Sequence, residues 1–366
     1  MGRRLPPSPT TSHPIARVDA SILELPYRVP MRTASNDFSM ATGLLVSVTT
    51  TGGVTGYGYS DVFARTGETP STAQTIVTSI LAPLVLGRDL AELPRIRSTI
   101  DQRLLGNPRA KAALDTALLD ALARGLHVPL YILLGGRSRD SVGLVRMVGV
   151  GSSESMAAAA AVATRDGAGV KLKLGGDLVE DIARVAAVRD RVGDACFIKV
   201  DANEAYDARG AVRLATRLAD LDVVTLEQPV ARLDLASLAE VTRRSPIAIE
   251  ADQSVRTVED AHRLVKHRIV DSINTGIARL GSIAAVRQVA EICRLGGVRC
   301  TLSNTAGSMV GDAAAVHLAA SLVDFDDRCE LEFETVLGDP FGGLQVVNGR
   351  VPVPLGTGLG VQSVSV

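Results

Sequence analysis

Four short apolar segments between residues 169 and 253 decide the fold, and each ends in polar residues. They read GVKLKL (169–174), FIKVDAN (197–203), VVTLEQP (223–229) and IAIEADQ (247–253). Asp201 and Glu227 are 26 residues apart (227 − 201), and Glu227 and Asp252 are 25 apart (252 − 227). One strand, one helix and two loops occupy about that length, so the spacing predicts consecutive βα units. In a closed parallel barrel the carboxyl ends of the strands meet on one face, where these three acids would gather.

Three acidic side chains from adjacent strand ends suit a hard divalent cation. Mg²⁺ prefers oxygen ligands in an octahedron and keeps positions open for water or substrate. We therefore predict a Mg²⁺ site formed by Asp201, Glu227 and Asp252, with Asn203 beside it. Acids after strands also serve as helix N-caps, but three at matched spacing favour the metal. Glu250 shares a face with Asp252 and is the competing ligand.

A lysine pair on the first of these segments is the candidate catalytic group. Side chains alternate along a strand, so Lys171 and Lys173 point to the same side. If that side is the barrel interior, two ammonium groups face the metal, and buried lysines need a purpose. A cation beside a like charge and a metal loses its proton more easily, which makes Lys173 a candidate general base.

At these residues the chain resembles the enolase superfamily, in the muconate cycloisomerase-like branch of the mandelate racemase/muconate lactonizing enzyme family. The matching motifs are Lys171-x-Lys173, Asp201-x-Asn203, Glu227-Gln228-Pro229 and Asp252, and the likeness runs from about residue 14 to residue 360. The resemblance implies Mg²⁺-assisted removal of the proton next to a carboxylate, through an enediolate. It also implies that Lys173 is the base, that Lys171 is its electrostatic partner, and that Asp252 rather than Glu250 is the third ligand.

The resemblance and the element pattern together predict an α/β fold, a modified TIM barrel (β/α)7β with an N-terminal α+β capping domain. Antiparallel strands and then helices precede residue 138, and strand–helix alternation follows from residue 142. We expect a disordered leader at 1–13, the cap at 14–138, the barrel at 139–340, and a C-terminal segment, 341–366, that returns to the cap. The eighth barrel strand is expected at 330–334.

Three positions depart from the resembled pattern. Members of this branch usually carry a second lysine at the end of the sixth barrel strand, where this chain has Gly276. Without an acid or base at that position, two-base racemisation is disfavoured, and one-base reactions such as syn-elimination or cycloisomerisation remain. Gln253 stands where the family usually has Glu, and Tyr59 stands where many members have a cap Glu.

Several further side chains are candidate substrate contacts. Arg32, in the first cap loop, is placed to clamp a carboxylate, although a solvated surface arginine is an equal alternative. Asn304, after the seventh strand, is a candidate hydroxyl or carboxylate contact. Glu332 and Glu334 lie where some dipeptide epimerases bind an amino group, which hints at an amine-bearing substrate.

Composition narrows the function classes. The net charge of −1 gives no electrostatic reason to bind nucleic acid or an anionic membrane. No apolar run reaches the ~18–20 residues of a membrane span. The four cysteines form no CxxC pair, which indicates free thiols in a reducing compartment, and we expect a cytoplasmic enzyme. The resemblance further implies a small-molecule carboxylate substrate and a homo-oligomer.

Three functions stay open at this point. The first is a one-base cycloisomerase or lyase with Lys173 as the base. The second is a racemase or epimerase of an amino-acid-like or dipeptide-like acid with an atypical second base. The third is a protein that keeps the metal and the fold but has lost catalysis.

Overall fold

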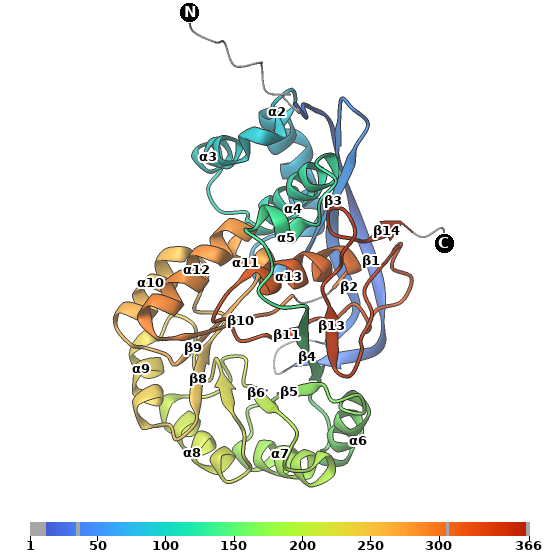
Figure 1. Cartoon of the computed structure of the whole chain (residues 1–366). Helices are drawn as coiled ribbons and strands as arrows, with labels where there is room; N and C mark the ends of the chain where they lie inside the picture. The colour runs from blue at the N-terminus through green and yellow to red at the C-terminus, as the bar shows by residue number, and fades with distance from the viewer. Residues whose placement is uncertain (1–11, 34–36, 305–306, 364–366) are drawn as a thin grey trace, which may run out of the picture.

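The computed structural model describes residues 12–33, 37–304 and 307–363. Most of the predicted leader, residues 1–11, therefore lies outside the described part of the chain. The described residues form a capping region with long strands and short helices, and below it a ring of βα units (Figure 1). Within these residues, no helix combines the length and the apolar character that a bilayer crossing requires.

The cap is a three-stranded antiparallel sheet covered by helices. Its elements are β1 (Ile15–Arg32), β2 (Asp37–Thr50), β3 (Thr55–Asp61), α1 (Pro70–Thr75), a π-helical turn (Ile76–Leu81), α2 (Ala82–Val85), α3 (Leu93–Arg103), α4 (Pro108–Gly125) and α5 (Leu130–Leu133). Helix α4 lies directly on β3 because Gly56 and Gly58 have no side chains. A Cβ on either glycine would lie 2.1 Å from the α4 backbone.

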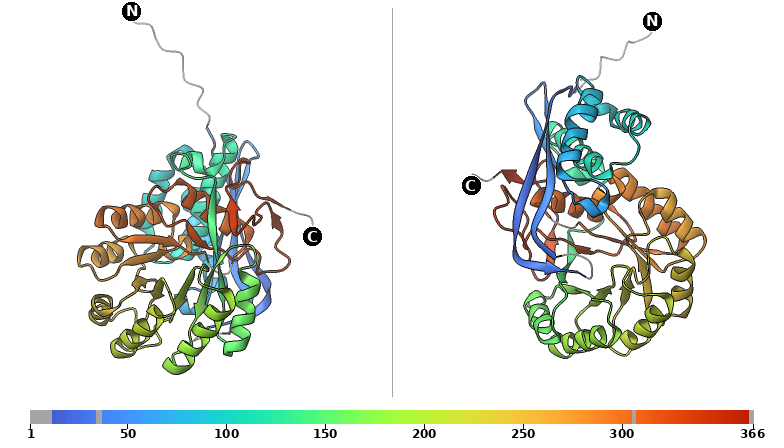
Figure 2. Two further views of the ribbon diagram at one scale, coloured as in Figure 1. Left: turned by 60° about the horizontal axis from the view of Figure 1, so that its bottom comes forward. Right: turned by 180° about the vertical axis from the view of Figure 1, so that it is seen from behind.

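The barrel consists of eight strands with helices on the outside, as Figure 2 shows from two further sides. In chain order its elements are β4 (Ser141–Val148), α6 (Ser153–Ala163), β5 (Gly169–Lys173), α7 (Leu178–Val192), β6 (Ile198–Asp201), α8 (Ala208–Ala219), β7 (Thr225–Glu227), α9 (Leu235–Arg244), β8 (Ala248–Ala251), α10 (Val258–Lys266), β9 (Ser272–Thr275), α11 (Ile277–Leu280), α12 (Ile283–Gly296), β10 (Arg299–Leu302), α13 (Met309–Ser321) and β11 (Arg328–Glu330). This is the predicted (β/α)7β arrangement with its cap.

The parallel ring follows chain order and closes between its last strands. The strands pair in the order β10-β9-β8-β7-β6-β5-β4-β11. A parallel bridge between Ser303 and Glu330 joins β10 to β11, with the Asn304 amide donating to the Glu330 carbonyl at 2.9 Å. The predicted bounds of the eighth strand were wrong. Strand β11 ends at Glu330, so the Glu332–Glu334 segment follows the strand instead of forming it.

Alternation along each strand separates an apolar outer face from a polar interior. Val170, Leu172, Val200, Leu226 and Ile249 are fully buried. We assign them to the face that the helices cover. The neighbouring positions carry charged side chains that are also buried, which are Lys171, Lys173, Lys199, Asp201, Glu227, Glu250 and Glu330. Buried charges of this density are held only when they pair with one another.

The C-terminal segment contacts both parts of the molecule. Strand β13 (Arg350–Pro352) pairs with β4 of the barrel. Farther along, the Leu359 amide donates to Asp120 on α4 at 2.7 Å, and Gly358 exchanges backbone hydrogen bonds with Val128 and Leu130. The segment thus crosses from the barrel to the cap.

Candidate active site

A cavity of about 590 Å³ lies between the cap and the carboxyl ends of the barrel strands. Its size suits a small organic molecule. Cap residues such as Tyr27, Phe38 and Phe63 form the apolar side of its lining. Nine of the residues predicted from the sequence also line it, namely Lys171, Lys173, Asp201, Asn203, Asp252, Gln253, Gly276, Asn304 and Glu332.

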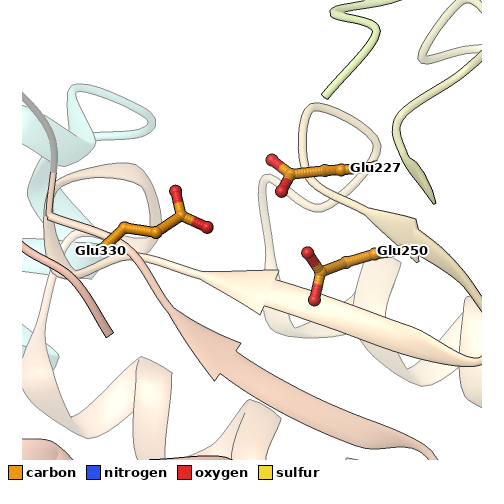
Figure 3. Close-up of side chains that lie close together, drawn as sticks. All are labelled: Glu227, Glu250 and Glu330. Carbon is orange, nitrogen blue, oxygen red and sulfur yellow. The ribbon is translucent and has the colours of Figure 1, made fainter. Parts of the chain in front are cut away.

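Beneath this cavity three glutamates converge (Figure 3). One carboxylate oxygen from each of Glu227, Glu250 and Glu330 lies within 4.8 Å of the others. Lys199 contacts all three, at 2.9 Å from Glu227, 2.5 Å from Glu250 and 2.8 Å from Glu330. Lys171 adds contacts of 2.8 Å to Glu227 and 2.7 Å to Glu330.

The two lysines favour the charged forms of Glu227 and Glu330. Burial by itself raises the pKa of Glu227, but the ammonium groups of Lys171 and Lys199 bring it well below its usual value. Burial raises the pKa of Glu250, and the nearby Glu227 carboxylate raises it further. Burial opposes the charge on Lys171, yet Glu227 and Glu330 outweigh it and raise its pKa. Lys171 is therefore held as a cation, which suits an electrostatic role better than proton transfer.

The strand register explains why Glu250 approaches Glu227. Across β5 to β8 the paired positions are Lys173 with Asp201, Asp201 with Glu227, and Glu227 with Glu250. Asp252 lies two residues farther along, just past the end of β8 at Ala251. Equal sequence spacing therefore does not place Asp252 level with Glu227. It places Asp252 higher, at the cavity wall.

Asp201 and Asp252 face the cavity and pair with cations, Asp201 with Lys173 and with Lys171 at 3.3 Å, and Asp252 with Arg279. The Lys173 ammonium lies 2.6 Å from Asp201. Arg279 forms an ion pair with Asp252. Neither acid is an N-cap, because Asp207 and Thr257 cap the helices that follow these two strands.

Gln228 is a positioning residue for which the sequence suggested no role. Its side-chain oxygen accepts from the amides of Asp252, at 3.0 Å, and Ser254, at 3.1 Å. Its backbone φ of 35° is left-handed, as is the φ of 46° at Asn203. Strain of this kind persists where the surroundings fix a loop, and it clusters at functional sites.

The donor set at the cavity wall fits a divalent cation. Two buried side-chain oxygens there, Asn203 Oδ1 and Gln253 Oε1, have no hydrogen-bond partner among the described residues. Carboxylate and amide oxygens are the ligands that Mg²⁺ prefers. The glutamate cluster fits less well, because Lys199 already occupies its centre.

The predicted substrate contacts divide into two groups. Glu332 and Asn304 are buried at the cavity, where Tyr27 donates to Glu332 at 3.2 Å and Asn304 donates to Asp312 at 2.6 Å. The other three lie elsewhere. Tyr59 is buried beside Gly311 of α13, the side chain of Arg32 is 70% exposed near Asp37, and Glu334 pairs with Arg146.

A basic rim, formed by Arg65, Arg232 and Arg256, was not singled out from the sequence. The three side chains line the cavity and come from the cap and from the loops after β7 and β8. Arg65 and Arg232 both contact Glu204, at 3.2 and 2.7 Å. No local sequence pattern marks these residues, because the fold alone brings them together.

The chain matches two family models. Residues 17–135 match the mandelate racemase/muconate lactonizing enzyme N-terminal domain, and residues 155–364 match the enolase C-terminal domain-like model. Muconate cycloisomerase 1 of Rhodococcus opacus is 34% identical over 360 residues, covering 95% of each chain. L-Ala-D/L-Glu epimerase of Bacillus subtilis is 33% identical over 356 residues, covering 95% of this chain and 96% of the epimerase.

Solved structures agree with these matches. A substrate-liganded complex of the Bacillus subtilis L-Ala-D/L-Glu epimerase superposes with a TM-score of 0.92 at 31% identity, over 96% of this chain and all of that one. A dipeptide epimerase from Enterococcus faecalis, complexed with Mg and the dipeptide L-Leu-L-Tyr, gives 0.91 at 29% identity, over 95% and 99%. Both likenesses extend over the cap and the barrel together.

Proposed function

Because the chain belongs to the mandelate racemase/muconate lactonizing enzyme family of the enolase superfamily, we propose that it removes the α-proton of a small carboxylate with Lys173 as the single base. The observation that carries this is an asymmetry of the cavity. Lys173 faces the cavity from the end of β5, and the end of β9 presents Gly276 in its place. One face of a bound acid therefore meets a proton acceptor, and the other meets none from that position.

Asp201, Glu227 and Asp252 would hold a Mg²⁺ ion, assisted by Asn203. Such an ion, when bound, stabilises the negative charge that develops on the substrate carboxylate as the α-proton leaves. Glu227 is paired with Asp201 across β6 and β7 and also belongs to the buried glutamate cluster, so it would be shared between the ion and that cluster.

The residues of the chain supply the proton chemistry. Lys173 Nζ accepts the α-proton, and the C–H electron pair passes into an enediolate. In a syn-elimination, a β-substituent leaves from the same face and takes the proton back from Lys173. In a cycloisomerisation, a ring bond forms or breaks, and Lys173 accepts or donates the α-proton on the same face of the substrate. Lys171, held as a cation beside Glu227 and Glu330, contributes positive potential near the substrate carboxylate.

A second candidate is an epimerase of an amino-acid-like or dipeptide-like acid. Glu332 is buried at the cavity wall, where a carboxylate suits a substrate amino group. The similarity to dipeptide epimerases supports it. Gly276 disfavours it, because inversion needs a proton donor on the face opposite Lys173.

A cytoplasmic location and a homo-oligomeric state remain predictions.

Solvent exchange tests the assignment of Lys173. Muconate-like acids, β-substituted acids and dipeptides are incubated with Mg²⁺ in D₂O, and α-deuterium and products are followed by NMR. We expect exchange or turnover on one face in the parent, at least about 10²-fold slower in Lys173→Ala, the usual size of a general-base contribution. Lys266→Ala, at an exposed lysine on α10, is the control and should match the parent.

The outcomes separate the candidates. Unchanged exchange in Lys173→Ala would rule out Lys173 as the base. Inverted product carrying deuterium in both enantiomers would establish the epimerase. Metal and ligand binding without exchange across the whole panel would indicate a protein that has lost catalysis.

A further inference from the structure

Gly276 leaves a space that Arg279 takes up. Residue 276 has φ −160° and ψ 138°, an extended backbone that any residue adopts, so the conformation does not require glycine. A Cβ added there would meet the Ser303 carbonyl oxygen at 3.1 Å and the Arg279 guanidinium at 3.5 Å. A longer side chain would therefore run into Arg279, three residues along on α11.

Arg279 is aimed at the cavity and not at solvent. It lines the cavity together with Gly276, and only 18% of its side chain is exposed. Its guanidinium forms an ion pair with Asp252, which is 16% exposed. Its Nε is buried and has no hydrogen-bond partner among the described residues. A guanidinium carries five donors, so one carboxylate does not satisfy it.

The strand order places Arg279 across the barrel from Lys173. In the eight-strand ring, β5 and β9 are separated by β6, β7 and β8 on one side and by β4, β11 and β10 on the other. Lys173 ends β5, and Gly276 and Arg279 follow directly after β9. The two cations therefore approach the cavity from opposite walls.

We propose that Arg279 binds the anionic oxygens of the substrate on the face opposite Lys173, and that this fixed cation takes the place of a second acid/base. Arginine stays protonated, so it donates charge-assisted hydrogen bonds without transferring the α-proton. Gly276 is then the residue that makes room for it. This inference rests on the proposed function and deepens it. Proton transfer is then limited to the Lys173 face for two reasons: position 276 has no acid or base, and Arg279 lies on the opposite face.

Oxalate is a suitable probe, because it is a small dianion in which each carboxylate group has two anionic oxygens on one carbon, as the enediolate does. Its binding is measured by titration calorimetry, with and without Mg²⁺, on the parent, Arg279→Gln, Arg279→Lys and the control Lys266→Ala, at an exposed lysine on α10. We expect Arg279→Gln to weaken oxalate binding roughly 10-fold or more in both conditions, the size of a lost hydrogen bond to a charged group. Arg279→Lys should keep part of the affinity, and Lys266→Ala should bind oxalate like the parent. Thermal melts check that each variant is folded.

A purely structural role for Arg279 gives a different pattern. If Arg279 only neutralises Asp252, Arg279→Gln changes the affinity for Mg²⁺ and leaves oxalate binding without Mg²⁺ at the parent value, which overturns the proposal. A parent that binds no oxalate in either condition overturns it too. Oxalate binding that depends on Arg279, with no exchange in D₂O for any acid, would instead refute the proposed function and leave the anion site standing.

Discussion

At the scale of single residues, buried ionisable groups outside the cavity set the pH response of the fold. His317 on α13 is fully buried and stacks on Tyr131, with ring centroids 5.6 Å apart. Burial lowers the pKa of His317 from 6.5 to about 4. Between those values the unfolded chain binds a proton that the folded chain does not.

His317→Leu should therefore flatten the acid response. In the parent, the contribution of His317 to stability is complete above about pH 6.5 and is lost as the pH falls toward 4. At the acid end this loss is roughly 3 kcal/mol. Urea unfolding at several pH values measures it. The parent should lose more stability than His317→Leu between pH 7 and 4.5, and His262→Leu, at an exposed histidine, should follow the parent. Equal slopes in all three proteins would contradict the assignment.

Some residues of the candidate site could be predicted from the sequence, and others could not. Lys173, Asp201 and Asp252 follow from the motif, because each lies at the end of a strand or one residue past it and lines one cavity. Lys199 was open to prediction, since it lies two residues before Asp201 and so on the same face. The role of Arg279 was not open to prediction, because its approach to Gly276 depends on the helical turn of α11 between the two residues.

At the scale of elements, the barrel strands are held together inside by charge pairs. Three glutamates from β7, β8 and β11 share two lysines from β5 and β6. Removing one partner of such a buried group leaves charge without compensation.

Lys199→Met should destabilise the fold by about 3–5 kcal/mol, because Glu250 loses its closest cation. Adding Glu250→Gln to Lys199→Met should recover part of that loss. Lys266→Met, on the exposed side of α10, is the control and should unfold with the parent. Denaturant unfolding measures all four proteins. If Lys199→Met is as stable as the parent, the cluster does not depend on Lys199 for its charge balance.

Elements were easier to predict than their register. Apolar segments and their spacing, together with the resemblance, were sufficient to predict the eight strands, since the strands are short and bounded by polar loops. The pairing of Glu227 with Glu250 depends on how far each strand is staggered, and spacing alone does not contain that. The predicted bounds of the eighth strand were wrong for a related reason. The backbone amides of Glu332 and Phe333 donate hydrogen bonds to the Asp312 side chain and are not part of β11.

At the scale of the whole molecule, the cavity exists because the cap covers the carboxyl ends of the barrel strands. Apolar cap residues face a wall of charged barrel residues, so a bound acid would have its polar end toward the barrel. The cap and barrel architecture was predicted from the motifs and the resemblance. The basic rim was not predicted, because Arg65 comes from the cap and Arg232 and Arg256 come from barrel loops, and only the folded chain brings them to one cavity.

We propose that the divalent cation binds at the cavity wall, between Lys173 and Arg279, and not in the glutamate cluster beneath. Anomalous diffraction from crystals soaked in Mn²⁺, a substitute for Mg²⁺ with the same preference for oxygen ligands, locates it directly. We predict one strong peak bounded by Asp201, Glu227 and Asp252. A peak among Glu227, Glu250 and Glu330, or no peak in either place, would contradict the proposed metal site.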